Sequence, residues 1–278
     1  MKSKRTILEK LLLVVSIVFL TSFSLIPVLW GLSTSLKTES AIYAIPPRWI
    51  PNPLTFSHYA SILANGAMLQ HFLNTSIISF LTMCGSLRIG ILGAYGFSRF
   101  RFPGRNTLLW SILFTRLLPR VTIIIPLYIV LRNMHLLNTY AGLVLVYLLI
   151  VMPMAVWLLK GFFDNLPYEI EEAAVLDGCS SFGVLTRIVI PISMPAIATV
   201  AMYSFILAWN EFLFALIMTN GKAIRPISVG LAFFIDEAGV HWGPLMAASM
   251  LMSVPAVVVF MALQTQLVHG LSEGAVKS

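Results

Sequence analysis

The sequence YAGLVLVYLLIVMPMAVWLLKGFF, residues Tyr140–Phe163, decides the fold class, because it is long and carries one charged side chain, Lys160. A helix of about 24 residues rises roughly 36 Å, which is enough to cross a hydrocarbon core of about 30 Å with some tilt. A backbone in lipid must pair its N–H and C=O groups internally, and a run of this length is too long for a barrel strand. The stretch is therefore predicted to be a transmembrane helix.

Five further apolar blocks lie on either side of this stretch. They run over Leu11–Leu36, Phe72–Phe97, Leu108–Leu131, Pro195–Thr219 and Pro244–Val268. Only 10% of the 278 residues are charged, whereas soluble domains carry about 25%. We predict an all-α integral membrane protein with six transmembrane helices and a single domain over residues 1–278. A signal peptide is the alternative for the first block, but that block is too long and no small-residue cleavage site ends it.

Charge and cysteine content exclude several other classes of protein. The net charge of +7 comes from basic residues scattered around the apolar blocks, which indicates control of topology rather than binding of nucleic acid. Cys84 lies in an apolar block and Cys179 in a polar loop, so no disulfide is expected, and the five histidines show no metal-ligand spacing. Neither a catalytic constellation nor a Gly-rich phosphate loop with its Lys is visible. The sequence therefore predicts no enzymatic activity and no metal site.

The positions of Lys and Arg predict which side of the membrane each loop faces. Basic residues precede the first block and fill the connection Ser98–Thr107, whereas Arg132 is the only basic residue in the next connection. The positive-inside rule then places the N-terminus in the cytoplasm, and six spans return the C-terminus to the same side. The connection Asp164–Met194 is expected to be cytoplasmic as well. The outer side is expected to hold Lys37–His71, Arg132–Thr139 and Asn220–Gly243.

The connection Asp164–Met194, called the coupling segment below, carries its own secondary-structure signals. Pro167 suits a first helical turn, and the acidic residues after it suit a helix N-terminus. Gly178 is expected to stop that helix in the left-handed conformation. Ser180 or Ser181 can cap a second short helix that runs to about Ile190. The segment is therefore predicted to be a compact helix–turn–helix at the membrane surface.

Several residues of this segment match a known motif, and they are Glu172, Ala173, Ala174, Asp177, Gly178, Ile188, Pro191 and Pro195. Their spacing resembles the EAA loop of binding-protein-dependent ABC importer permeases. The resemblance implies that the first seven of these residues form coupling helices that dock into a cleft on a cytoplasmic ATPase dimer. ATP and Mg²⁺ are then expected on that ATPase, with no cofactor in this chain. The alternative is an amphipathic surface helix without a partner.

The resemblance covers nearly the whole chain and points to the carbohydrate-uptake branch of that family. Its motifs are Asn74-Thr75, Ala94-Tyr95, Arg99–Gly104, Pro119, Pro126-Leu127, Leu137–Thr139, Gly142-Leu143 and Trp209–Phe212. The tail Gly270–Lys277 is similar to the end of the six-span subunit of maltose-type importers, where it reaches toward the ATPases. Cys179 and Leu185 depart from the usual Ala and Phe. The resemblance implies a second, homologous permease subunit, an external solute-binding protein, and a bacterial or archaeal cytoplasmic membrane.

Four polar residues inside the apolar blocks are candidates for a solute path. A charge at membrane depth costs at least about 2.5–3.5 kcal/mol, so it is expected to face a cavity, a partner or the bundle interior. Arg116 and Arg120 are four residues apart and are expected on one helix face; alternatively they bind carbonyls freed by Pro119, or the partner subunit. Asn210 and Glu211 are candidates for the path or for a subunit interface. Arg88 is expected to pair with Glu211 or to reach the cytoplasmic side.

The sequence as a whole predicts the permease subunit of an ATP-driven importer for a sugar or oligosaccharide. A glycerol-phosphate importer is the alternative within that class, because Arg116 and Arg120 would suit an anion. A self-contained secondary transporter is the alternative outside it, and such proteins usually have inverted repeats and ionisable residues in broken helices. The EAA motif argues against a secondary transporter. Membrane lipid is the remaining expected partner.

Overall fold

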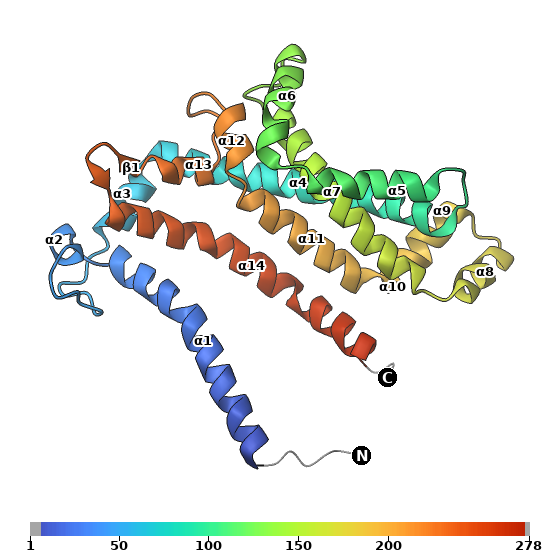
Figure 1. Ribbon diagram of the computed structural model, residues 1–278, viewed down its shortest axis with the longest axis horizontal. Helices are drawn as coiled ribbons and strands as arrows, with labels where there is room; N and C mark the ends of the chain where they lie inside the picture. The colour runs from blue at the N-terminus through green and yellow to red at the C-terminus, as the bar shows by residue number, and fades with distance from the viewer. Residues whose placement is uncertain (1–6, 276–278) are drawn as a thin grey trace. The chain divides into compact units, whose positions relative to one another are not determined.

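The computed structural model describes the backbone of residues 7–275 and the side chains of residues 8–265 (Figure 1). The basic residues Lys2, Lys4 and Arg5 and the end of the tail Gly270–Lys277 lie outside the described residues, as do the side chains of the rest of that tail. The helices of the first half are α1 Ile7–Ser35, α2 Glu39–Ile42, α3 Ser57–Ala64, α4 Gly66–Arg99, α5 Arg105–Phe114, η1 Thr115–Leu117, α6 Arg120–Asn133 and α7 Tyr140–Asp164. The second half contains α8 Tyr168–Leu176, α9 Ser181–Val184, η2 Leu185–Val189, α10 Ile190–Ile192, α11 Met194–Trp209, α12 Leu213–Met218, α13 Ile227–Ala232, the antiparallel strand pair β1 Ile235–Asp236 and β2 Gly239–Val240, and α14 Trp242–Ala275.

The predicted all-α membrane fold is confirmed. Within the described residues, four helices are long and apolar enough to span a membrane, namely α1, α4, α7 and α14. Two further pairs of helices satisfy the same test together but are bent, so the number of spans reaches six if each bent pair counts as one. Prolines at 27, 126, 153 and 255 lie inside helices without ending them.

The third predicted span, Leu108–Leu131, is not one helix. It breaks between η1 and α6, and the two parts are bent by 105° (Figure 1). Pro119 has no N–H to continue the helical ladder and disfavours a helical conformation at the residue before it, and Leu118 is extended with φ −69° and ψ 130°. The prediction that Arg116 and Arg120 share one helix face is therefore wrong, because one ends the first part and the other begins the second.

The fifth predicted span, Pro195–Thr219, is also interrupted. Helix α11 ends at Trp209, and α12 begins at Leu213. The carboxylate of Glu211 accepts hydrogen bonds from the backbone N–H groups of Phe214 and Ala215, both at 3.1 Å. These two N–H groups have no partner within α12, so the glutamate caps the new helix.

The chain divides into two compact units. One contains the residues up to Leu69 together with Leu231–Ser253, and the other contains Gln70–Gly230 and the residues from Val254 onward. In the first unit, the buried ammonium of Lys37 lies 4.2 Å from the ring centroid of Trp30, which in turn packs edge-on against Trp49. Burial lowers the pKa of Lys37 from its usual value.

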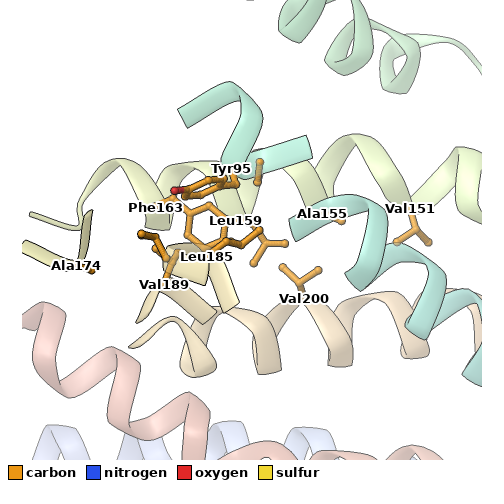
Figure 2. Close-up of a cluster of buried hydrophobic side chains, with 11 residues drawn as sticks. Tyr95, Val151, Ala155, Leu159, Phe163, Ala174, Leu185, Val189 and Val200 are labelled. Atoms are coloured by element: carbon orange, nitrogen blue, oxygen red, sulfur yellow. The ribbon is translucent and has the colours of Figure 1, made fainter. Parts of the chain in front are cut away.

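A buried apolar cluster in the second unit joins the coupling segment to the spans. It contains Tyr95 of α4, Leu159 and Phe163 of α7, Ala174 of α8, Leu185 and Val189 of η2, and Val200 of α11. Figure 2 shows Tyr95, Phe163 and Leu185 close together in this cluster. A second cluster in the same unit packs Ile78 of α4, Tyr147 of α7 and Phe214 of α12 together. The coupling segment is therefore packed into the same core as three of the long helices.

Candidate coupling site and membrane cavities

The coupling segment adopts the helix–turn–helix that its sequence predicts. Helix α8 follows Pro167 and ends before Gly178, whose φ of +85° is the left-handed conformation that glycine adopts most easily. The side chain of Ser180 accepts a hydrogen bond from the N–H of Gly183 at 3.2 Å, and so caps α9. The sequence signals in this segment are local, and they were sufficient to predict its path.

The second helix of the segment contains a π-helical turn, which the sequence did not predict. The turn covers η2, and α10 follows it directly with Pro191 in its first turn. Because Pro191 has no N–H to donate to the preceding turn, the regular ladder cannot continue through it. A bend of 81° then separates Ser181–Ile192 from α11, so the segment leaves the direction of the span at Ser193.

The seven predicted coupling residues fall into an exposed group and a packed group. Glu172, Ala173, Asp177, Gly178 and Pro191 are exposed, whereas Ala174 is buried and Ile188 is partly buried against the apolar cluster. Two large apolar side chains flank the turn, and these are Leu176, which is 89% exposed, and Phe182, which is 67% exposed. Exposed apolar side chains around a charged, structured turn are typical of a docking surface.

An ion pair that the sequence did not predict holds α8 against the spans. Nε of Arg99 donates to Glu171 at 2.6 Å, and the hydroxyl of Tyr95 donates to the same carboxylate at 3.1 Å. Arg99 also donates to the carbonyl of Phe163 at 2.8 Å. The side chains of Arg99 and Glu171 are 7% and 11% exposed. Helix α8 thus presents Glu172 outward while the neighbouring Glu171 is bound to α4 and α7.

Further polar contacts surround this ion pair. The hydroxyl of Ser98 donates to Asp164 at 2.7 Å, and Asp164 also pairs with Lys160 at 2.5 Å. The guanidinium of Arg99 lies 4.3 Å from the ring centroid of Tyr168, the first residue of α8. Every charged group at this junction is therefore satisfied by a partner within the chain.

A different polar region lies where the bent span meets α11. A cavity of about 730 Å³ is lined by Arg120, Tyr203, Asn210 and Glu211 among others, and it is called the Arg120–Glu211 cavity below. An adjacent cavity of about 490 Å³, the Arg116–Arg120 cavity, lies between the bent span and α7. Nη1 of Arg116 donates to the hydroxyl of Tyr203 at 2.8 Å. The break at Pro119 thus brings together all four residues predicted to form the path.

Glu211 and Arg88 differ in part from their predicted roles. Glu211 is 4% exposed and its carboxylate caps α12, so it has a structural role in addition to lining a cavity. Arg88 is exposed and makes no ion pair or hydrogen bond with its side chain to any residue whose side chain is described. The expected pair between Arg88 and Glu211 is therefore not formed. Asn210 donates to the carbonyl of Ile206 at 2.9 Å and also lines the cavity.

Metal-binding groups and disulfides were not expected from the sequence. Among the described residues, no group of three or more His, Cys, Asp or Glu side chains could hold a metal ion. Cys84 and Cys179 are both free and partly buried. Cys179 packs beside the apolar cluster, and Leu185 is buried within it, so both departures from the family pattern lie in the core of the segment.

The sequence is similar to transport permeases over almost its whole length. A family model described as "Binding-protein-dependent transport system inner membrane component" matches residues 86–273. The trehalose/maltose transport system permease protein MalG of Thermococcus litoralis is 31% identical over 284 residues, covering 99% of each chain. The trehalose transport system permease protein SugB of Mycobacterium tuberculosis is 31% identical, covering 92% of this chain and 93% of its own.

Two further similarities involve transporters of charged saccharides. The sulfoquinovosyl glycerol transport system permease protein SmoH of Agrobacterium fabrum is 31% identical, covering 91% of this chain and 89% of its own. The crystal structure of a bacterial ABC transporter involved in the import of the acidic polysaccharide alginate contains a chain that superposes with a TM-score of 0.79, covering 95% of this chain and 99% of that chain at 22% identity. The latter match shows a shared fold.

Proposed function

This chain belongs to the family of binding-protein-dependent transport system inner membrane components, and from that premise we propose that it carries a sugar or oligosaccharide across the cytoplasmic membrane. It is a permease subunit of an ATP-driven importer, and ATP hydrolysis is the work of a separate ATPase subunit. The similarity to permeases for trehalose and maltose supports a sugar as the solute. The same similarity disfavours a glycerol-phosphate importer and a secondary transporter.

One observation carries the coupling role, namely the exposed turn of the coupling segment on a base that is fixed to the spans. The residues that would contact the ATPase are Glu172, Ala173, Asp177 and Gly178, with Leu176 and Phe182 beside them. Ala174 and Ile188 pack the segment from within, and Pro191 helps to set its path. A displacement of this turn by the ATPase dimer would be passed to α4 and α7 through Glu171 and Arg99.

The solute would pass beside the broken third and fifth spans. Arg116, Arg120, Asn210 and Glu211 line the two cavities there. Backbone that leaves the helical ladder at membrane depth is tolerated where it is buried in protein or lines a cavity. Movement of the coupling segment would open this region first to one side and then to the other, which requires only two stable arrangements of one packed unit.

The partners and orientation follow from the same assignment. The importer would contain an ATPase dimer that binds ATP and Mg²⁺, a second homologous permease subunit and an external solute-binding protein, with membrane lipid around the spans. The exposed apolar side chains of α1, such as Phe19 and Phe23, suit lipid or the second permease. The contact between Glu171 and Arg99 supports a common side for the coupling segment and the basic loop after α4, which is the cytoplasmic side if both termini are cytoplasmic. The two compact units would act together as one permease domain.

Reconstitution in lipid vesicles tests this proposal. The chain alone should neither hydrolyse ATP nor take up solute, whereas the complex with its ATPase, second permease and loaded binding protein should do both. Uptake driven by an ion gradient, with this chain as the only protein, would contradict the proposal. Labelling of a cysteine at position 57 from outside, and of one in the Arg99–Arg105 loop only from the cytoplasm, tests the orientation in the same vesicles.

A further inference from the structure

We propose that the transported saccharide carries a negatively charged group, and that Arg120 binds this group with Arg116 and Tyr203 beside it. The group would be a carboxylate, a sulfonate or a phosphate on the sugar. The inference rests on the proposed function, because it names the chemical class of solute that the same path accepts. It is carried by the charge balance of the two cavities.

The Arg116–Arg120 cavity carries positive charge without an internal counter-ion. Both guanidinium groups line it, and none of the described residues that line it is acidic. Most of its wall is apolar, including Ile123, Leu127 and Ile150. An apolar wall weakens the screening of charge by water, so a charged guest of opposite sign is favoured more strongly here than at an open surface.

The Arg120–Glu211 cavity has one acidic residue among the described residues that line it, but its carboxylate is already bound. Both oxygens of Glu211 accept backbone N–H groups at the start of α12. The guanidinium of Arg120 makes no hydrogen bond or ion pair with any residue whose side chain is described. Arg120, which lines both cavities, therefore retains its full set of donors for a ligand.

Tyr203 extends the donor set next to Arg120. Its hydroxyl oxygen accepts the hydrogen bond from Arg116, so its own hydrogen remains free to point into the Arg120–Glu211 cavity that it lines. An arginine fork with a neighbouring hydroxyl matches the geometry of a carboxylate, sulfonate or phosphate, which two parallel N–H donors can bind. A neutral hydroxyl of a sugar would use only part of this set.

Two other sources of negative charge could occupy the same arginines. One is the phosphate of an anionic lipid, and the other is a carboxylate of the second permease subunit. The solute is favoured because Arg120 lies at a break between spans where two cavities meet, whereas an arginine that serves only a lipid or a neighbouring subunit needs no cavity of this size. The experiment below separates the three sources.

The test measures binding of a matched pair of probes to the assembled importer in nanodiscs of phosphatidylcholine, without its binding protein. The probes are digalacturonate and its dimethyl ester, which differ only in the charge of their carboxyl groups. The wild-type complex should bind the acid at least about tenfold more tightly than the ester. Arg120→Gln should abolish this preference, Arg116→Gln should reduce it, and Arg120→Lys should retain part of it. Arg132→Gln is the matched control, because Arg132 is exposed on the same helix and lines neither cavity.

Each other outcome would overturn the inference. Equal binding of the two probes, a preference that survives Arg120→Gln, or no binding of either probe at millimolar concentration would do so. Loss of the second permease on purification of Arg120→Gln would assign the arginine to the subunit interface. Phosphatidylglycerol that co-purifies with wild type but not with Arg120→Gln would assign it to lipid. ATP-driven uptake of a neutral sugar alone would refute this inference and leave the proposed function intact.

Discussion

The coupling segment and the break at Pro119 both interrupt the apolar pattern of the chain, but they treat their charged side chains in opposite ways. In the coupling segment, Arg99 binds Glu171 and the carbonyl of Phe163, and it is almost fully buried. At the break, Arg120 is exposed to a cavity and its side chain has no partner among the described residues. A charge that is satisfied within the chain holds the structure together, whereas an unsatisfied charge is available to another molecule.

The comparison also identifies an exception on each side. Glu211 lies beside the break, yet both of its carboxylate oxygens are bound by the chain. Glu172 lies on α8 next to the buried Glu171, yet it is exposed. We therefore expect Glu211 to behave as a structural residue and Glu172 as a contact residue. The predictions below test this division, from the largest expected effect on transport to the smallest.

Removal of one member of the buried ion pair is expected to have the largest effect. Glu171→Leu leaves the guanidinium of Arg99 buried without its acid, which costs about 3–5 kcal/mol in comparable pairs. We expect α8 to detach from α4, with nearly complete loss of uptake. Hydrogen exchange over Tyr168–Leu176 and solute uptake at equal subunit abundance measure the two effects.

The double variant Arg99→Met with Glu171→Leu is the control for this prediction. It removes both charges, and apolar replacement of a buried ion pair is often neutral in stability. We expect slow exchange in α8 to return in large part. Wild-type uptake by Glu171→Leu alone would show that the ion pair does not fix the segment.

Gly178→Asp is expected to uncouple the chain from its ATPase. A side chain at φ +85° is disfavoured by about 1–2 kcal/mol, and nothing in the chain lies within 4 Å of the position that a Cβ would take. The rest of the effect must then come from a docked partner, where an unpaired charge is unfavourable. We expect at least a tenfold loss of co-purified ATPase with normal membrane insertion.

Gly104→Asp is the matched control, because Gly104 has φ +80° and also has no atom within 4 Å of a Cβ. It imposes similar backbone strain outside the coupling turn. Equal ATPase recovery in both variants would remove Gly178 from the docking surface.

Glu172→Lys is expected to weaken the same contact more moderately. Reversal of one exposed charge changes the binding free energy by about 1 kcal/mol, which is roughly a fivefold change in affinity. The difference should shrink in high salt because exposed charges are screened. Titration of the ATPase against the permease at two salt concentrations measures it. Glu237→Lys, an exposed charge reversal in the turn between β1 and β2, should leave ATPase affinity unchanged.

Glu211→Gln is expected to have the smallest effect on transport. The amide oxygen of glutamine can still accept at the start of α12, so one hydrogen bond is weakened at a cost of about 1 kcal/mol. We expect uptake within about twofold of wild type and no change in the preference for charged solutes. A loss of that preference would place Glu211 among the residues that contact the solute.

The long helices could be predicted from the sequence, because hydropathy over a long run is a local property. The breaks could not. Prolines at 119, 126, 153 and 255 all lie in apolar runs, yet only Pro119 separates two helices. Neighbouring helices can supply partners for the carbonyl that a proline leaves free, and such partners are not visible in a single sequence.

The coupling segment shows the same division at the level of residues. Pro167, Gly178 and Ser180 set its path through local rules, and the structure follows them. The ion pair joins residues 72 positions apart, and the choice of Glu171 rather than Glu172 depends on which face of α8 meets α4. The resemblance to a known motif marked Glu172, but it gave no sign that its neighbour was the anchor.

Cys179 directly follows Gly178 and is one of only two cysteines in the chain. It is a free thiol, partly buried at the turn, and the other thiol, Cys84, lies far away in the sequence on α4. Replacement of Cys84 by Ser would therefore leave a single native attachment point for a fluorophore or spin label beside the turn. A label there would report changes in its surroundings during each cycle of ATP hydrolysis, without an introduced cysteine.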